Sequence, residues 1–521
     1  MGLLPEIDRA WVTVDHRLLL WDWADGCVPR FSRIRLHTED TPRRSSFSTF
    51  EELTDVIVGV GLVTPRKGVF VDAISHLLVL ATPNQITLVG IGYAAPSPGA
   101  KREVTFYLTG LTVSTDGISL TTVRGTSTGR IFLASSPDPL TPGGIGGDGC
   151  LYELVYQSAE GWFVKRCTLY NLTSGSLTQS IVPSFLRGLS AVATNDWIIA
   201  LEVDNERGLV YTLLRHGTIE MYQLPSSAPG AKFDGPPTKV AKSGDVLRLA
   251  QVICPGSPML NARNFKIVAL EVLSVREGGN GKIGLIAVTS TGAFSFFSRA
   301  CEQELTHGAG VRLYFSHQRR GGYGYYAVTA QPAALELCHV RPPPTPSAPQ
   351  PPPTNAYFSQ PAPPPPAPAS SIAFNSVIQA KYASGGLLLA ANNLTADLDV
   401  LLLAAPDVAA AARASAEAAV GTNAGAATRV FVEVAGTIEI AGRTWDMAEI
   451  TKTGGLVSGG TALNELATQA TEPRREWVIL TNMGANVVVR QRPVDTLREV
   501  LEGVGMTGGG GQGEVGVFFE R

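Results

Sequence analysis

The sequence is poor in charge and lacks the patterns that mark a secreted or membrane-spanning chain. Charged residues make up 17% of its 521 residues, and the net charge of −3 gives no overall field that would attract nucleic acid. Its first residues contain no apolar signal-peptide core, and no uninterrupted apolar run reaches the roughly 18 residues of a transmembrane helix. The six cysteines show no CxxC spacing, which favours reduced intracellular thiols over a disulfide framework or a zinc site.

The sequence also lacks a catalytic or cofactor motif in the right context. Residues 125–129 (GTSTG) fit GxSxG, but a strand follows the serine where a nucleophile elbow needs a helix, so the pattern favours a β-turn. Residues 144–149 (GIGGDG) fit GxGxxG, yet they too run into a strand and offer no helix to hold a pyrophosphate. The histidines have no metal-ligand spacing. We therefore expect no enzymatic activity, catalytic residue, cofactor or metal.

What the sequence does contain is a long series of short β-type runs. Hydrophobic residues make up 44% of the chain, with 55 glycines and 35 prolines, a mixture that favours an all-β fold with many turns. The clearest run begins with GRIFLA at 129–134 and continues with residues 150–157 and 162–167, which flank the loop SAEG. These segments predict most of one antiparallel four-stranded sheet, the size of a propeller blade.

The residues of this predicted sheet, together with six other stretches in the same order, closely resemble the large scaffold nucleoporins of the nuclear pore inner ring, the non-FG type of 155/170 kDa. The other stretches are Pro5–Asp15, Leu18–Trp23, Val60–Gly68, His76–Pro83, Val311–Ser316 and Arg492–Leu501. The resemblance implies a seven-bladed N-terminal propeller over residues 1–491, with long inter-blade loops. It also implies that residues 492–521 begin a junction to an α-helical solenoid. Because the chain ends soon after that junction begins, we expect it to be a fragment or a short gene model.

Two biased segments interrupt the expected propeller. Residues 342–368 contain 14 prolines and cannot form central strands, so we expect an extended loop between blades. Residues 404–427 form a second, alanine-rich loop. Near the end, Pro493 can occupy the first turn of a short helix over residues 494–502.

Residues 173–190 (TSGSLTQSIVPSFLRGLS) are the strongest candidate for membrane contact. On a helix their bulky apolar side chains would form one stripe, opposite a polar face on which Arg187 is the only charge. Such a helix suits a membrane surface with packing defects, and the resemblance implies a lipid-packing sensor in an inter-blade loop at this position. Pro183 is unfavourable within a helix, which leaves a loop docked on the propeller as the alternative. The predicted membrane-binding residues are Leu177, Ile181, Val182, Phe185, Leu186 and Leu189.

Two basic segments are candidates for binding phosphate or acidic lipid. Residues 29–44 hold five arginines, and residues 318–326 (QRRGGYGYY) interleave arginine with tyrosine as single-strand RNA binders do. A solvated surface insertion explains either segment more simply, so we expect no direct nucleic-acid partner.

The sequence therefore predicts a non-enzymatic scaffold of the nuclear pore complex at the nuclear envelope. It would contact the pore membrane surface without a transmembrane segment, anchor other inner-ring nucleoporins, and support the transport of protein and RNA indirectly. The alternative is a soluble β-propeller adaptor in trafficking or signalling, which shares the fold but leaves the apolar stripe unexplained. A propeller hydrolase or lyase is disfavoured because no set of His, Asp and Glu residues converges.

Overall fold

The structure is a computed structural model, and every structural statement below concerns the segments of chain that it describes. These segments are residues 1–23, 47–95, 102–135, 149–157, 167–173, 197–225, 235–257, 260–262, 265–275, 283–290, 311–317, 335–341, 377–383, 387–393, 397–407, 433–450 and 473–507.

Nearly all regular structure in these segments is β-strand, and each sheet is built from strands that follow one another in the chain. A sheet of four strands is called a blade here, numbered in chain order. Blade 1 consists of β1 (Gly2–Leu4), β2 (Arg9–Val14), β3 (Arg17–Asp22) and β4 (Phe47–Phe50), with the short 3-10 helix η1 (Pro5–Ile7) after β1. Blade 2 consists of β5 (Gly59–Val63), β6 (His76–Ala81), β7 (Gln85–Ala94) and β8 (Glu103–Ser114). Blade 3 consists of β9 (Leu120–Gly125), β10 (Ile131–Ser135), β11 (Leu151–Tyr156) and β12 (Cys167–Asn171).

Three further blades follow. Blade 4 consists of β13 (Ile198–Asp204), β14 (Leu209–Leu214), β15 (Ile219–Gln223) and β16 (Thr238–Lys242), and the helix α2 (Val246–Ile253) comes after it. Blade 5 consists of β17 (Ile267–Val272), β18 (Ile283–Thr289), β19 (Arg312–Ser316) and β20 (Glu336–Arg341). Blade 6 consists of β21 (Val377–Ala383), β22 (Leu387–Asn393), β23 (Leu398–Pro406) and β24 (Glu433–Ala441).

The all-β expectation is confirmed, but the expected seven-bladed propeller is wrong. In the described segments six sheets have the four strands of a blade, and the remaining sheet has three: β25 (Thr444–Glu449), β26 (Glu476–Thr481) and β27 (Gly484–Val489). Among the described residues this sheet has no fourth strand like the one at the outer edge of each blade, so the half-exposed β27 is its edge there. The expected short helix is present as α5 (Pro493–Thr507).

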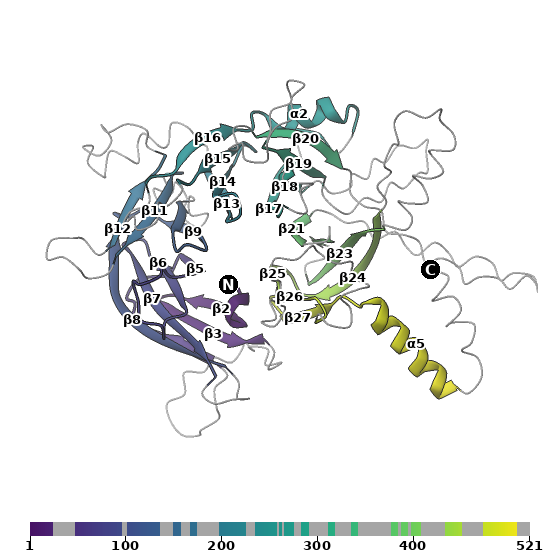
Figure 1. The fold of residues 1–521 in the computed structure, drawn as a ribbon, viewed down its shortest axis with the longest axis horizontal. Coiled ribbons are helices and arrows are strands. Elements are labelled where there is room, and N and C mark those ends of the chain that lie inside the picture. Colours follow the sequence, from purple (N-terminus) through teal and green to yellow (C-terminus); the bar gives the residue numbers. More distant parts are fainter. Residues whose placement is uncertain are drawn as a thin grey trace, which may run out of the picture. The chain divides into compact units, whose positions relative to one another are not determined.

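The described chain forms two compact units, and the larger one comprises Val12–Leu20 and Phe47–Arg443. It contains blades 2–6, whose first strands β5, β9, β13, β17 and β21 are successive neighbours. Figure 1 shows these blades in chain order, with the first strand of each on the inner side. Chain order alone thus sets which blade faces which, as expected for a fold of repeated antiparallel sheets.

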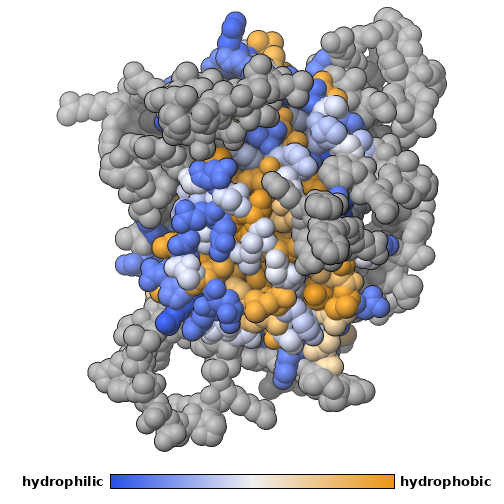
Figure 2. All heavy atoms as spheres, turned by 90° about the vertical axis from the view of Figure 1, so that its left-hand side faces the viewer, coloured by the Kyte–Doolittle hydropathy of each residue, from blue (hydrophilic) through white to orange (hydrophobic). Residues whose placement is uncertain are grey.

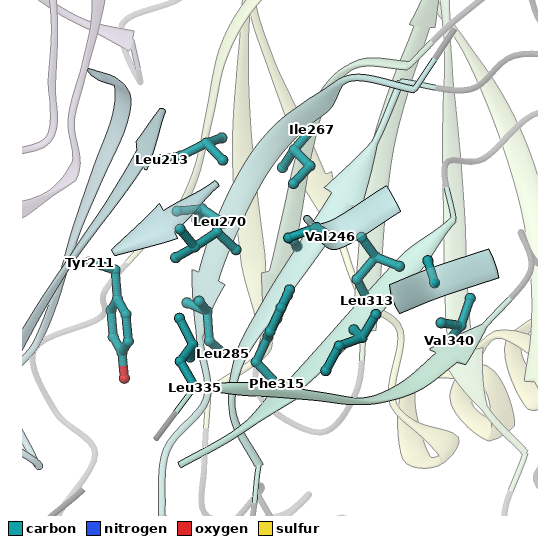
Figure 3. Close-up of a cluster of buried hydrophobic side chains, with 14 of the residues drawn as sticks. Tyr211, Leu213, Val246, Ile267, Leu270, Leu285, Leu313, Phe315, Leu335 and Val340 are labelled. Carbon is teal, nitrogen blue, oxygen red and sulfur yellow. The ribbon is translucent and has the colours of Figure 1, made fainter. Parts of the chain in front are cut away.

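The core of this unit is a series of apolar layers between adjacent blades. The layer between blades 4 and 5 includes Tyr211 and Leu213 from β14, Leu285 from β18 and Phe315 from β19, which belong to the cluster drawn in Figure 3. Other layers join blade 2 to blade 3, blade 3 to blade 4, and blade 5 to blade 6. Because both faces of a middle strand are covered, β10 and β11 are buried at every position, which explains why their sequences are apolar except for Ser135 and Glu153.

The smaller unit comprises Met1–Trp11, Trp21–Ser46 and Thr444–Arg521. Within it, the backbone N–H of Leu3 on β1 donates a 2.9 Å hydrogen bond to Asp446 Oδ2 on β25. Buried Arg9 pairs with buried Asp22 at 2.9 Å. The helix α5 begins where the Arg492 guanidinium donates to both carboxylate oxygens of Asp495, at 2.8 and 3.0 Å.

Candidate docking surfaces

All six predicted membrane-binding residues, Leu177, Ile181, Val182, Phe185, Leu186 and Leu189, lie in residues 174–196, outside the described segments. The basic segments 29–44 and 318–326 lie outside them too, as do the proline-rich loop 342–368 and residues 408–427 of the alanine-rich loop. These expectations therefore stay predictions. The structure describes only the residues that flank each segment.

The two ends of the predicted membrane segment are anchored on adjacent blades. Thr173 follows β12, the last strand of blade 3, and its Oγ1 accepts a 2.9 Å hydrogen bond from the backbone N–H of Leu151. Trp197 precedes β13, the first strand of blade 4. The guanidinium of Arg215 lies 4.2 Å from the centre of the Trp197 ring. The segment is therefore an inter-blade connection, which is the position that the resemblance implies.

Exposed apolar and aromatic side chains lie on the outermost strands of blades 2 and 3. On β8, Leu108 is 67% exposed and Tyr107 is 36% exposed, and Tyr170 on the neighbouring β12 is 46% exposed. Figure 2 looks at the side of the molecule where β8 and β12 are labelled in Figure 1, and apolar side chains gather there between hydrophilic ones. We call the outer strands β8 and β12, with exposed Tyr107, Leu108 and Tyr170, the β8–β12 surface. Tyr107 and Leu108 point to opposite faces of β8, because successive residues of a strand alternate, so a partner would contact all three only by lying across the outer edges of both strands. β8 is also the edge of its sheet, so it offers both apolar side chains and a strand edge to a partner.

A second exposed apolar group lies on α2, which the sequence analysis did not identify. Asp245 caps the helix by accepting a hydrogen bond from the Arg248 backbone N–H, and Val246 and Ala250 are buried beneath it. Leu249, Val252 and Ile253 lie on the outer side, with Val252 80% exposed. The spacing i, i+3, i+4 places these three on one helix face.

Two titratable side chains buried between blades, His317 and Cys167, are held in their neutral forms and are poorly suited to catalysis. Tyr211 Oη and His317 Nε2 are 2.6 Å apart, and burial, with a smaller effect from Arg207, lowers the pKa of His317 to about 4. Burial raises the pKa of the Cys167 thiol to about 12, which makes it a poor nucleophile. No group of three or more metal-ligating side chains occurs in the part of the chain that the structure describes.

The GxSxG pattern is a turn, as predicted. The Thr126 N–H donates to the Arg130 carbonyl at 2.9 Å, closing a hairpin between β9 and β10. Gly129 has a φ of +88°, and a Cβ there would lie 2.5 Å from the Arg66 backbone nitrogen. Position 129 thus requires glycine for backbone reasons. Of the GxGxxG pattern only Gly149 lies within the described segments.

Two buried ion pairs with two contacts each were, like the Arg9–Asp22 pair, not predicted from the sequence. Arg130, just before β10, binds Glu153 on β11 through Nε–Oε1 at 2.7 Å and Nη2–Oε2 at 2.8 Å. Arg312 on β19 binds Glu433 on β24 in the same two-pronged way, at 2.5 Å for both contacts. Both pairs are structural, because each guanidinium is almost fully covered and is held by its carboxylate.

No helix in the described part of the chain is long and apolar enough to cross a membrane.

Comparison with known proteins gives a consistent identity. Residues 1–486 match the nucleoporin family described as Nup133 N terminal like. The nuclear pore complex protein Nup154 of Drosophila melanogaster is 29% identical over 96% of this chain and 31% of its own length. The nucleoporin NUP170 of Chaetomium thermophilum is 28% identical over 96% of this chain and 31% of its own length.

A solved structure agrees with these matches. The crystal structure of the Chaetomium thermophilum Nup170 NTD–Nup53 complex superimposes with a TM-score of 0.64 at 26% identity, over 96% of this chain and 60% of that one. The chain spans about a third of the length of the curated relatives it matches. Since the family match covers nearly the whole chain, the chain belongs to the nucleoporin family with a Nup133-like N-terminal region.

Proposed function

We propose that this chain is the N-terminal scaffold region of an inner-ring nucleoporin, which holds other nucleoporins in place at the nuclear envelope. The carrying observation is the agreement in sequence and fold with the Nup170 N-terminal domain over 96% of the chain. The relatives are nucleoporins, which supports a structural role over an enzymatic one. A soluble adaptor in trafficking or signalling would share the sheets but not this family membership.

The partner that we propose is an apolar segment of another nucleoporin, bound on the β8–β12 surface. The related Nup170 domain was crystallised with the nucleoporin Nup53, so a protein of that kind is the occupant to test. Exposed Leu108, Tyr107 and Tyr170 supply apolar contacts, and aromatic side chains are enriched in protein interfaces.

A binding measurement tests this surface. Leu108→Asp and Tyr170→Asp should each weaken binding of the Nup53-related nucleoporin from the same organism by at least about tenfold, because each buries a charge against apolar groups. Thr112→Asp, at an exposed polar position of β8, is the matched control and should bind as the wild type does. Equal binding by all three variants in titration calorimetry would exclude the β8–β12 surface as the docking site.

We further propose that residues 177–189 contact the pore membrane. The supporting observations are the apolar stripe, Arg187 as the only charge, and the anchoring of both ends on blades 3 and 4. Binding should then depend on exposed hydrocarbon and not on lipid charge. Small neutral liposomes should float with more protein than large ones, and added salt should change this little.

A matched pair of variants separates stripe insertion from other contacts. Phe185→Asp with Leu186→Asp should abolish flotation, whereas Ser176→Asp with Ser180→Asp adds the same charge to the polar face and should retain most of it. Binding that instead requires anionic lipid and fades with salt would point to the basic segment 29–44. Equal flotation with large and small neutral liposomes would refute the packing-sensor assignment.

The domain division is also a proposal: residues 1–491 as the propeller, and residues 492–521 as the start of a junction to an α-helical solenoid. It is supported by apolar Val494 and Leu501 on α5, which are 38% and 51% exposed. If α5 packs on further helices in a longer protein, these side chains become covered there. Hydrogen exchange slower at α5 in the longer protein than in this chain is the expected result, and equal exchange would contradict the junction.

A further inference from the structure

Four charged side chains occupy equivalent positions on the first strands of blades 3, 4, 5 and 6. Each is the fifth residue of its strand. The equivalence is structural, because β13, β17 and β21 each carry a register shift after their first residue. The four residues, called the inner belt, are Arg124 on β9, Glu202 on β13, Glu271 on β17 and Lys381 on β21.

Ion pairs within the inner belt link blade 3 to blade 4 and blade 5 to blade 6, whereas the two belt residues at the boundary between blades 4 and 5 carry the same charge. Arg124 Nη2 lies 3.1 Å from Glu202 Oε1, which links blade 3 to blade 4. Lys381 Nζ lies 3.2 Å from Glu271 Oε1, which links blade 6 to blade 5. Between blades 4 and 5, in contrast, the neighbouring belt residues are two glutamates. Like charges on adjacent strands repel one another and are destabilising.

One of the two glutamates is much more covered than the basic members of the belt. The Glu271 side chain is 15% exposed, against 45% for Arg124 and 38% for Lys381. The pKa of Glu271 is raised to about 7, chiefly by burial and also by Glu202, against the lowering effects of Lys381 and, more weakly, Arg124. These are the charged groups that act on Glu271 from β13, β21 and β9. The residue opposite Glu271 on β18 is the apolar Ile286.

We propose that Glu271 is a proton switch at the boundary between blades 4 and 5. With its proton, Glu271 is neutral beside Glu202, and the two blades pack through their apolar layer without charge repulsion. When the proton leaves, two carboxylates lie on the neighbouring strands β13 and β17. The ion pair with Lys381 offsets only part of the cost of the new charge, and the contact between the blades is weakened. The switch arises because the order of charges along the inner belt places two glutamates, Glu202 and Glu271, on the neighbouring first strands of blades 4 and 5.

The direction of the pH effect follows from proton linkage. An unfolded glutamate has a pKa of 4.5, below the value of about 7 in the fold. Between these values the folded state holds more protons, so raising the pH favours unfolding, by up to tenfold in the unfolding constant per pH unit. The effect is absent below pH 4.5 and complete above about pH 7. Because Glu271 retains some solvent access, we expect a total change of at least about tenfold.

Denaturant unfolding of the wild type and of Glu271→Gln at pH 5.0, 6.0, 7.0 and 8.0 tests the switch. The unfolding constant of the wild type divided by that of Glu271→Gln should rise at least about tenfold from pH 5.0 to 8.0. The matched control is Glu449→Gln, which removes a carboxylate bound to Arg475 at 2.8 Å on β25, and its ratio should stay level over this range. A Glu271→Gln ratio that changes less than twofold would overturn the proposal.

The deciding result of a second measurement needs only the wild-type protein. With ¹³C-labelled glutamate, the wild type should show one carboxyl carbon that titrates with a midpoint between pH 6 and 8. Glu202→Gln should lower this midpoint, and Lys381→Met should raise it. If every glutamate in the wild type titrates below pH 5.5, Glu271 carries no proton near neutrality and the switch does not exist.

Discussion

Glu153→Ala should remove about 3–5 kcal/mol from the free energy of unfolding, because it leaves the Arg130 guanidinium buried without its counter-ion. The two side chains are 3% and 6% exposed and are joined by two hydrogen bonds. Within the described segments, Arg130 Nη1 already has no hydrogen-bond partner, and Nη2 would retain the Gly235 carbonyl at 3.1 Å. One neutral acceptor cannot replace a carboxylate that supplies two charge-assisted bonds, each contributing about 1.5–3 kcal/mol.

The same reasoning gives the opposite result when both charges are removed together. Arg130→Met with Glu153→Leu should be close to wild type in stability, or up to about 4 kcal/mol more stable, since neither charge then has to be desolvated. The measured quantity is therefore the coupling free energy between the two positions. It is obtained from a double-mutant cycle that compares Arg130→Met and Glu153→Leu singly with the double variant.

Urea unfolding followed by circular dichroism is the assay for this cycle. The matched control is Glu449→Ala, whose pairing with Arg475 is solvent-accessible on both sides and should cost no more than about 1 kcal/mol. A loss below about 1 kcal/mol for Glu153→Ala, or a double variant less stable than both single variants, would refute a buried, mutually dependent pair.

Three other changes have defined outcomes. Gly129→Ala should destabilise by at least about 1 kcal/mol in the same assay, because of the positive φ and the contact with Arg66; no loss would mean that the turn can relax. Hydrogen bonds from Arg492 hold the pKa of Asp495 below its usual range. Their stabilisation of the start of α5 is present above the unfolded pKa and is lost as pH falls through the folded value, so Asp495→Asn should flatten the acid dependence of amide exchange in α5. Replacing 342–368 with a short Gly/Ser link should change the thermal midpoint by less than about 5 °C, and a larger fall would show that the loop packs on the core.

Local sequence patterns correctly predicted those strands, turns and helices whose signals lie within a few neighbouring residues. GRIFLA and the LYELVY run were predicted to share a sheet, and β10 and β11 pair in blade 3. The GTSTG turn was predicted from the strand that follows it. The helix α5 was predicted from Pro493 and its apolar side, although it extends to Thr507.

The missed elements have weaker local signals. The strand β8 carries mostly exposed residues and contains Gly110, so neither a buried run nor a strict alternation marks it. The helix α2 is short, and only its Asp245 cap and apolar spacing signal it. The blade count was wrong because it came from the family resemblance, and no residue pattern distinguished a four-stranded sheet from the three-stranded β25–β27.

Contacts between blades could not be predicted, because their partners are far apart in the chain. Arg312 and Glu433 are separated by 121 residues, and nothing in the local sequence of either indicates the other. The inner belt depends on register: only when the first strands are aligned do Arg124, Glu202, Glu271 and Lys381 fall at one level. A charge in the middle of a buried run, such as Glu153 within LYELVY, was the one available signal for a buried ion pair.

The central claim, that this chain is a structural part of the nuclear pore, is tested most directly by locating the protein in cells. A fluorescent tag on the chromosomal gene, imaged with a marker of the nuclear pore, measures this with the full-length protein. A structural part of the nuclear pore should appear as puncta at the nuclear rim that coincide with the marker. A diffuse cytosolic signal, with no enrichment at the rim, would contradict it.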